Sequence, residues 1–181
     1  MAENERMVPF SQAARMLQTG FEWEAGLFAE MYKELCARLS KEEAREILGK
    51  AMYRAGVQLG REAKALSDMD GPLGIAKAWD VLYGMGTKEA QKLDADNFFV
   101  RVNACAALNV LRRFGLSDED ILYVGSAYCA GDQGHALGFD EKMAFQHTSR
   151  LMNGDDHCEW AFTTAPQEES PAKVPEEWFN T

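Results

Sequence analysis

The chain has 181 residues, of which 46% are hydrophobic and 27% charged, as in an ordinary globular protein that can bury one good core. Its formal net charge of −10 argues against nucleic acid or an anionic membrane as a partner, because phosphate binding relies on a basic face. The start, MAENERMVPF, has acids where a signal peptide needs a basic and then an apolar run. We therefore expect a cytoplasmic protein with reduced thiols and a small-molecule partner.

Helical periodicity dominates the first half of the chain. It predicts helices over about residues 11–20, 21–39, 41–66 and 72–84. Ser11 is expected to cap the first helix, which should end near Gly20. The third helix should begin with a capping box, SKEE, whose Ser and second Glu satisfy each other's backbone N–H groups. Two glycines one turn apart in it indicate close approach of another helix, or less readily of a ligand.

Strand-like alternation begins after Thr87. Strands are predicted over residues 89–94 and 98–104, and the clearest signal is a hairpin over 142–164, built around the turn-forming residues 153–156. Its apolar face should carry Met143, Phe145, His147, Ser149, Leu151, Cys158, Trp160 and Phe162.

Between these strands the helical pattern returns. It predicts one helix from Cys105 to Phe114 and a second from Ser117 toward Asp132, where Gly131 and Gly134 should break it. The predicted fold class is α+β, with N-terminal helices packed on an antiparallel sheet of about four strands. We assign residues 1–165 to a single domain and expect the Pro- and Glu-rich tail, 166–181, to be loosely ordered.

Five side chains that could take part in catalysis or metal binding lie where these elements end or meet. Cys105 lies at a strand end, Cys129 at a helix end and Cys158 inside the hairpin, while Asp132 shares a helix face with Cys129. His147 projects from the apolar strand face. Because helix and strand ends meet at one rim of an α+β sheet, we expect these groups to converge.

Three interpretations of this set remain open. A thiol paired with His147 suits nucleophilic catalysis, and two or three thiols with a His or Asp suit zinc, although the spacing matches no short zinc signature. Alternatively, the thiols and a hydrogen-bonded His simply line the core, which spacing alone favours. We expect no metal and no cofactor, and as catalytic residues we predict Cys105, Asp132 and His147. A helix N-terminus would favour the Cys105 thiolate, and His147 is the titratable group on the apolar face.

Three segments carry a family resemblance: RVNACAALNVLRRFGL, YVGSAYCAGDQG and FQHTSRLMNGDDHCEWAF. With the helix that contains Gly56 and Gly60, they resemble the L-2-amino-thiazoline-4-carboxylic acid hydrolase family over about residues 45–165. The resemblance implies a small hydrolase that opens a cyclic amidine such as an aminothiazoline carboxylate to an N-carbamoyl amino acid. It also implies that Cys129, Thr148 and Cys158 contact substrate. Either a Cys attacks the ring directly, or Asp132 or His147 activates water.

Two features depart from the family pattern, and two other functions stay open. His147 stands where the family tends to have a basic residue, often Arg, and Ala106 where it has Pro. The ending Gly-Asp-x-x-Cys-x-Trp also resembles the 4-vinyl-reductase-type domains, which bind small apolar molecules without catalysis. A helical dimerisation module with a purely structural sheet is the third candidate. We expect a possible homodimer through the N-terminal helices, because the chain has more amphipathic helix than one small sheet can cover.

Overall fold

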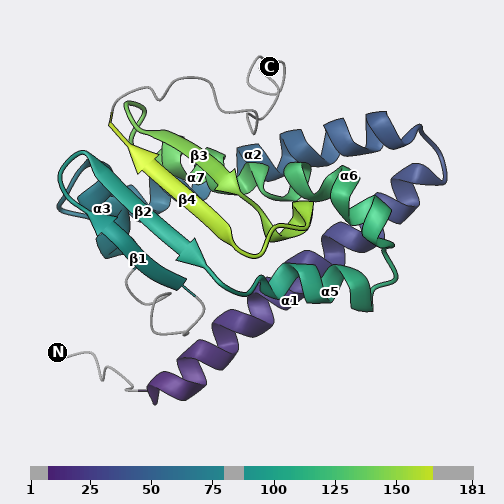
Figure 1. Ribbon diagram of the computed structural model, residues 1–181, viewed down its shortest axis with the longest axis horizontal. Coiled ribbons are helices and arrows are strands. Elements are labelled where there is room, and N and C mark those ends of the chain that lie inside the picture. The colour runs from purple at the N-terminus through teal and green to yellow at the C-terminus, as the bar shows by residue number, and fades with distance from the viewer. Residues whose placement is uncertain (1–7, 80–87, 165–181) are drawn as a thin grey trace, which may run out of the picture.

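The computed structural model describes residues 8–79 and 88–164. In chain order its elements are α1 (Phe10–Cys36), α2 (Lys41–Ala65), α3 (Gly71–Ala78), β1 (Lys88–Leu93), β2 (Asn97–Val102), α5 (Ala106–Arg113), α6 (Asp118–Tyr128), α7 (Ala130–Phe139), β3 (Ala144–Ser149), the 3-10 helix η1 (Leu151–Asn153) and β4 (Cys158–Thr163). The four strands form an antiparallel sheet in the order β1-β2-β4-β3, with helices gathered on one side of it and beyond one end (Figure 1). The predicted α+β class is confirmed.

The hairpin is formed by β3 and β4, which pair antiparallel with His147 opposite Trp160. Gly154 closes the turn with a φ of 89°, a conformation that glycine adopts without a steric penalty. The backbone N–H of Arg150 donates to Asp155 Oδ2 at 2.6 Å, and this hydrogen bond ties the turn to the end of β3. The prediction of a hairpin over residues 142–164 is thus confirmed, and its register places His147 on the helix-facing side.

Helix α2 begins at the predicted capping box. Glu43 N–H donates to Ser40 Oγ at 3.2 Å, and Ser40 N–H donates to Glu43 Oε2 at 3.0 Å. Two orphan donors of the first turn are satisfied in this way, so the local signal in the sequence was sufficient to fix the start of the helix.

The prediction that Gly131 and Gly134 break a helix was wrong. The chain turns at Cys129 and continues as α7, whose glycines let it pack against α2 backbone to backbone. A Cβ on Gly134 would lie 2.1 Å from the Tyr53 carbonyl oxygen, and one on Gly56 would lie 2.1 Å from the Gly131 carbonyl oxygen. Close helix packing therefore explains the glycines, and it holds the first turn of α7 in a defined place.

The N-terminal helices also differ from expectation. Residues 10–36 form one helix that passes through Gly20, and Pro9 takes the N-cap position, so Ser11 lies inside the first turn. The helix that starts at Gly71 ends at Ala78, short of the expected glycine pair at Gly84 and Gly86. That pair and the tail 166–181 lie outside the described residues.

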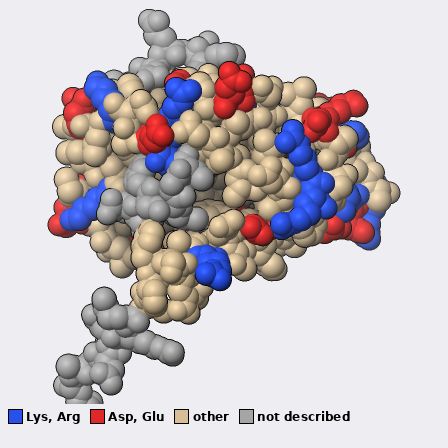
Figure 2. Space-filling model, turned by 60° about the horizontal axis from the view of Figure 1, so that its bottom comes forward, with Lys and Arg blue, Asp and Glu red and all other residues tan. Residues whose placement is uncertain are grey.

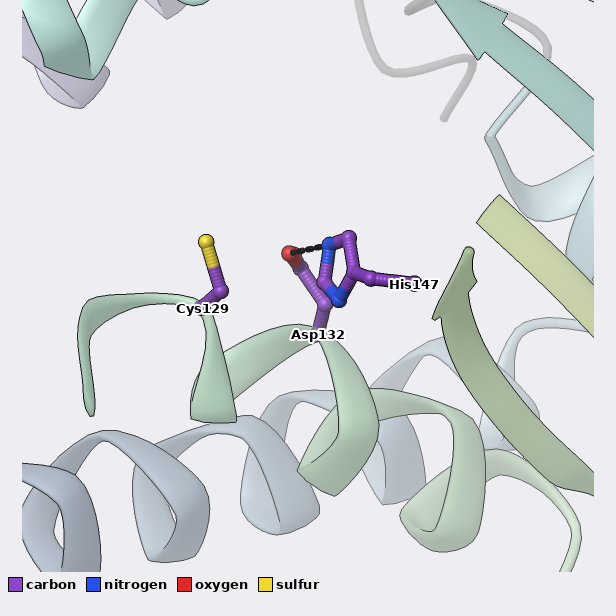
Figure 3. Close-up of side chains that lie close together, drawn as sticks. All are labelled: Cys129, Asp132 and His147. Atoms are coloured by element: carbon purple, nitrogen blue, oxygen red, sulfur yellow. Dashed lines mark ion pairs between the residues drawn. The ribbon is translucent and has the colours of Figure 1, made fainter. Parts of the chain in front are cut away.

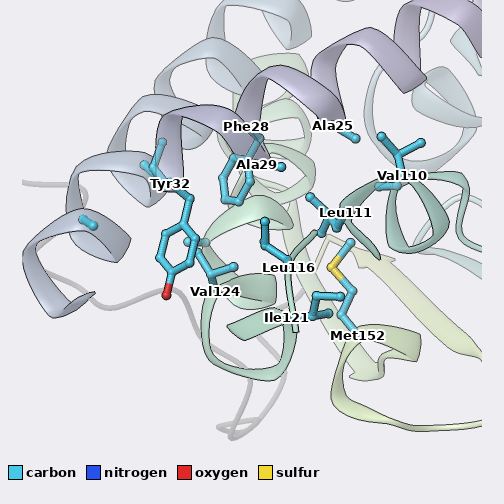
Figure 4. Packing of buried hydrophobic residues seen from close by; sticks show 14 of the residues in the cluster. Ala25, Phe28, Ala29, Tyr32, Val110, Leu111, Leu116, Ile121, Val124 and Met152 are labelled. Carbon is cyan, nitrogen blue, oxygen red and sulfur yellow. The ribbon is translucent and has the colours of Figure 1, made fainter. Parts of the chain in front are cut away.

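Two apolar cores support the site. The first joins α1, α2, α5 and α6 through Phe28, Tyr32, Leu48, Leu111, Ile121 and Val124 (Figure 4). The second joins the sheet to α3 and α7 through Ile75, Trp79, Phe98, Phe139, Phe145 and Phe162. Cys105 and Cys129 pack against the first core, whereas Cys158 belongs to the second. The predicted site thus lies where the two cores meet.

The described surface mixes charges of both signs. In the face shown in Figure 2, acidic and basic side chains alternate around uncharged residues rather than forming a broad basic patch. Among the helices of residues 8–79 and 88–164, none is both long and apolar enough to cross a bilayer.

Candidate active site

The centre of the candidate site is formed by Asp132 and His147. Asp132 lies in the first turn of α7 and His147 on β3, and His147 Nε2 is 3.3 Å from Asp132 Oδ2. Cys129 joins them from the corner between α6 and α7, so that one ligand atom from each of the three residues lies within 4.8 Å of the others. The carboxylate lies between the sulfur and the imidazole (Figure 3). Three groups predicted to converge do so, although His147 meets the carboxylate and not the Cys129 thiol.

Burial fixes the protonation of His147. Its side chain is only 3% exposed, and burial lowers the pKa of the imidazole, while the Asp132 carboxylate raises it in part. A neutral imidazole has one N–H, and we assign it to Nε2, where it donates to Asp132. Asp132 itself is 32% exposed, so its side chain remains partly accessible to a ligand.

Of the three thiols, Cys129 lies within 4.8 Å of this pair, and burial raises the pKa of all three. Burial raises the pKa of Cys105, raises that of Cys158 to about 11, and raises that of Cys129 well above its usual range. The charge of Asp132 adds to each of these upward shifts, so all three thiols lie within electrostatic range of this carboxylate. We expected the N-terminus of a helix to favour the Cys105 thiolate. The amides of Ala107 and Leu108 do lower its pKa, but burial outweighs them, so Cys105 needs a base.

Thr148 lies apart from the cluster. Its side chain is exposed and donates to Glu159 Oε2 at 2.9 Å on the outer face of the sheet. This placement follows from strand alternation, because the residue after His147 must point to the opposite face.

Several polar groups near the cluster were missed in the sequence. Lys88, at the start of β1, lies over the rings of Trp160 and Trp79, and both Asp132 and Cys105 act electrostatically on it. His135 Nε2 accepts a hydrogen bond from Trp79 Nε1 at 3.1 Å. The sequence of this strand, KEAQKL, is mostly charged and polar, so it does not show that Lys88 turns inward. Only the apolar residues around the strand could have indicated this.

Comparison with known families identifies the chain. The model of a family described as L-2-amino-thiazoline-4-carboxylic acid hydrolase matches residues 20–162. The chain belongs to this family. The matched segment contains every residue of the candidate site described above, from Lys88 on β1 to Cys158 on β4. A search of curated proteins found no match.

A solved structure shares the fold. The phenol-responsive sensory domain of the transcription activator PoxR, determined with phenol, superimposes with a TM-score of 0.53 at 15% sequence identity. The match covers 77% of this chain and 73% of that domain. At this identity the similarity shows a common fold for the hydrolase-family chain and a ligand-binding domain.

The cluster also contains a possible metal-ligand set. Cys129, Asp132 and His147 offer a sulfur, an oxygen and a nitrogen within 4.8 Å of one another. Tetrahedral zinc, with bonds of about 2.0–2.3 Å, holds ligand atoms about 3.5 Å apart. His147 and Asp132 are already that close, so a zinc ion would draw only the Cys129 sulfur toward them and would displace the His147 proton from Asp132.

An open pocket of about 920 Å³ has His147 among its lining residues. It is bordered by α2, α6 and the end of β3, with Arg45, Tyr123 and Arg150 among its walls. Arg45 donates to Ser126 Oγ at 2.9 Å there. His147 belongs both to this pocket and to the cluster.

Proposed function

We propose that the protein hydrolyses a cyclic amidine, with an aminothiazoline carboxylate as the reference substrate. Membership of the family supports a hydrolase, and the Asp132–His147 pair supports the assignment of the base. A partly exposed carboxylate that is oriented by a buried neutral imidazole can take a proton from a nucleophile. The pair lies among thiols at a site that combines apolar walls with a few polar groups, as ligand sites do.

In the proposed reaction Cys105, Asp132 and His147 are the catalytic groups. Asp132 takes the proton of the Cys105 thiol as the sulfur attacks the ring carbon between nitrogen and sulfur. The bond from that carbon to the ring sulfur breaks, and the ring sulfur leaves with the proton. Water then attacks the Cys105-bound carbon, one of its protons returning to Cys105 and the other to nitrogen. One water is consumed and an N-carbamoyl amino acid is released.

The other thiols form the walls of the proposed site. Cys158 Sγ accepts the Leu151 backbone N–H at 3.2 Å and lies at the β4 end of the cluster, and Cys129 lies beside Asp132. We assign both to substrate contact. Thr148 points to the outer face of the sheet, so we assign it to substrate contact only where it borders the open pocket.

The nucleophile is tested by comparing two serine variants. Cys105→Ser should lower turnover of aminothiazoline carboxylate by about 10²-fold or more with a nearly unchanged melting temperature, because a serine hydroxyl is a far weaker nucleophile. Cys36→Ser, which alters a thiol packed against the first core, should shift the melting temperature and spare turnover. If both variants lose only stability, Cys105 is not the nucleophile and Asp132 activates water directly.

Ligand binding without catalysis is the second candidate. The specific observation in its favour is the shared fold with a phenol-responsive sensory domain. In that case the thiols and His147 would only line a pocket. Saturable binding of a small planar ring together with a complete lack of turnover on cyclic amidines would favour it.

We also propose that the protein acts in the cytoplasm as a homodimer. All four cysteines are free thiols, which suits a reducing compartment. Met16, Trp23, Leu27 and Met31 are exposed on α1 at spacings of about one or two turns. A second copy of this helix would cover them. Light scattering that shows a monomer at micromolar concentration would rule the dimer out.

A further inference from the structure

Lys88 is a half-buried cation that the proposed reaction does not use. Its Nζ lies 4.6 Å from the ring centre of Trp160 and 5.6 Å from that of Trp79. Burial lowers the pKa of its ammonium, and the nearby Asp132 and Cys105 act in the opposite direction. Within residues 8–79 and 88–164, Lys88 forms no ion pair with a carboxylate. A desolvated ammonium in this position is suited to an anionic ligand.

Trp160 offers a second donor next to it. Its indole N–H is buried and finds no acceptor in the described part of the chain. The ring lies edge to face with Trp79, at 5.4 Å between ring centres, and 6.2 Å from the ring of His147. A buried donor without an acceptor costs about 1–3 kcal/mol, so this N–H also calls for a ligand oxygen.

We propose that Lys88 and the Trp160 indole N–H bind the carboxylate of the substrate. This inference rests on the proposed function and narrows it to planar ring substrates that carry a carboxylate. The Trp160 ring centre lies 4.6 Å from Lys88 Nζ and 6.2 Å from the ring centre of His147, and Asp132 and Cys105 act electrostatically on Lys88. A carboxylate held there places its ring between Lys88 and the reacting groups. The cation also offsets repulsion between the substrate carboxylate and Asp132.

Binding of an unreactive ring tests the assignment separately from catalysis. The probes are 2-aminothiazole-4-carboxylate, whose aromatic ring replaces the thiazoline, and 2-aminothiazole, which lacks the carboxylate. Calorimetry should show that the native protein prefers the carboxylate. Lys88→Gln should weaken carboxylate binding about 10- to 100-fold and leave 2-aminothiazole unchanged, because a charge-assisted hydrogen bond is lost. Trp160→Phe, which keeps a ring and removes the N–H, should weaken it about fivefold.

Lys92 provides the matched control. It lies on the same strand, with its Nζ 5.6 Å from the Phe99 ring and 3.2 Å from Asp94 Oδ2, at the exposed end of β1. Lys92→Gln should bind both probes as the native protein does. Lys88→Arg, which keeps the positive charge, should retain the preference for the carboxylate.

Two results would overturn the inference: native protein that binds the two probes equally or not at all, and Lys88→Gln that binds the carboxylate as tightly as the native protein. Failure of the proposed hydrolysis would look different. In that case the native protein would bind 2-aminothiazole-4-carboxylate in a Lys88-dependent way and still leave aminothiazoline carboxylate intact.

Discussion

His147 Nε2 lies 3.3 Å from Asp132 Oδ2, and this contact ties β3 to the first turn of α7. The imidazole is buried and neutral, while the carboxylate side chain is partly exposed. Two segments that are separated by the rest of α7 and the start of the hairpin thus meet at one polar contact between two apolar cores.

Stability should fall on the acid side of neutrality. Burial lowers the pKa of His147, and also that of His135, below the value near 6.5 of an unfolded histidine. Below pH 6.5 the unfolded chain therefore binds protons that the native chain resists, so the free energy of unfolding decreases as the pH falls through 6.5 toward the native pKa values. Denaturant titrations between pH 7.5 and pH 5 should show a loss that is smaller in His147→Gln. Parallel profiles for the two proteins would contradict this account of His147.

The α2–α7 contact should tolerate no side chain at its glycines. Gly134→Ala places a Cβ 2.1 Å from the Tyr53 carbonyl oxygen and should destabilise the protein by about 3 kcal/mol, because backbone must move. Gly20→Ala is the matched control. Gly20 lies in α1, and a Cβ added there would have nothing within 4 Å, so alanine should stabilise the protein by about 0.5–1 kcal/mol. Equal melting temperatures for the two variants would show that the close packing is not a feature of the protein in solution.

Local chemistry made part of this fold predictable. The capping box at Ser40 and the turn at Gly154 each depend on residues within five positions, and both are found where the sequence predicts them. Strand alternation likewise placed His147 on the helix-facing side. By contrast, the sequence around the glycines of α7 looks the same whether they break a helix or allow close packing. Only the backbone of α2, some 80 residues earlier by sequence number, shows that they serve packing.

The candidate site was predictable only in outline. Convergence of Cys129, Asp132 and His147 followed from their positions at element ends. Lys88 was missed because its inward direction depends on Trp79 and Trp160, which come from two other elements. The raised pKa of the Cys105 thiol was also missed. Its main cause is burial, which depends on tertiary packing, whereas the helix N-terminus that lowers the pKa is visible in the sequence.

Turnover should not depend on a bound metal. His147 Nε2 and Asp132 Oδ2 already lie 3.3 Å apart, but the Cys129 sulfur, within 4.8 Å of both, would have to move to about 3.5 Å from them to share a zinc ion. Metal analysis of purified protein should therefore find well under one equivalent of zinc, and chelation should leave the rate unchanged. One equivalent of zinc that is lost in Cys129→Ser and kept in Cys36→Ser would instead assign these residues to a metal centre.

The Asp132→Asn variant tests the central claim most directly. The amide keeps the shape of the carboxylate and a contact with His147, but it cannot accept the proton of the nucleophile. In assays of kcat/KM on aminothiazoline carboxylate, with the melting temperature measured in parallel, we expect a loss of about 10³-fold or more and a nearly unchanged melting temperature. A variant that folds normally and hydrolyses the ring at the native rate would contradict the assignment of Asp132 as the catalytic base.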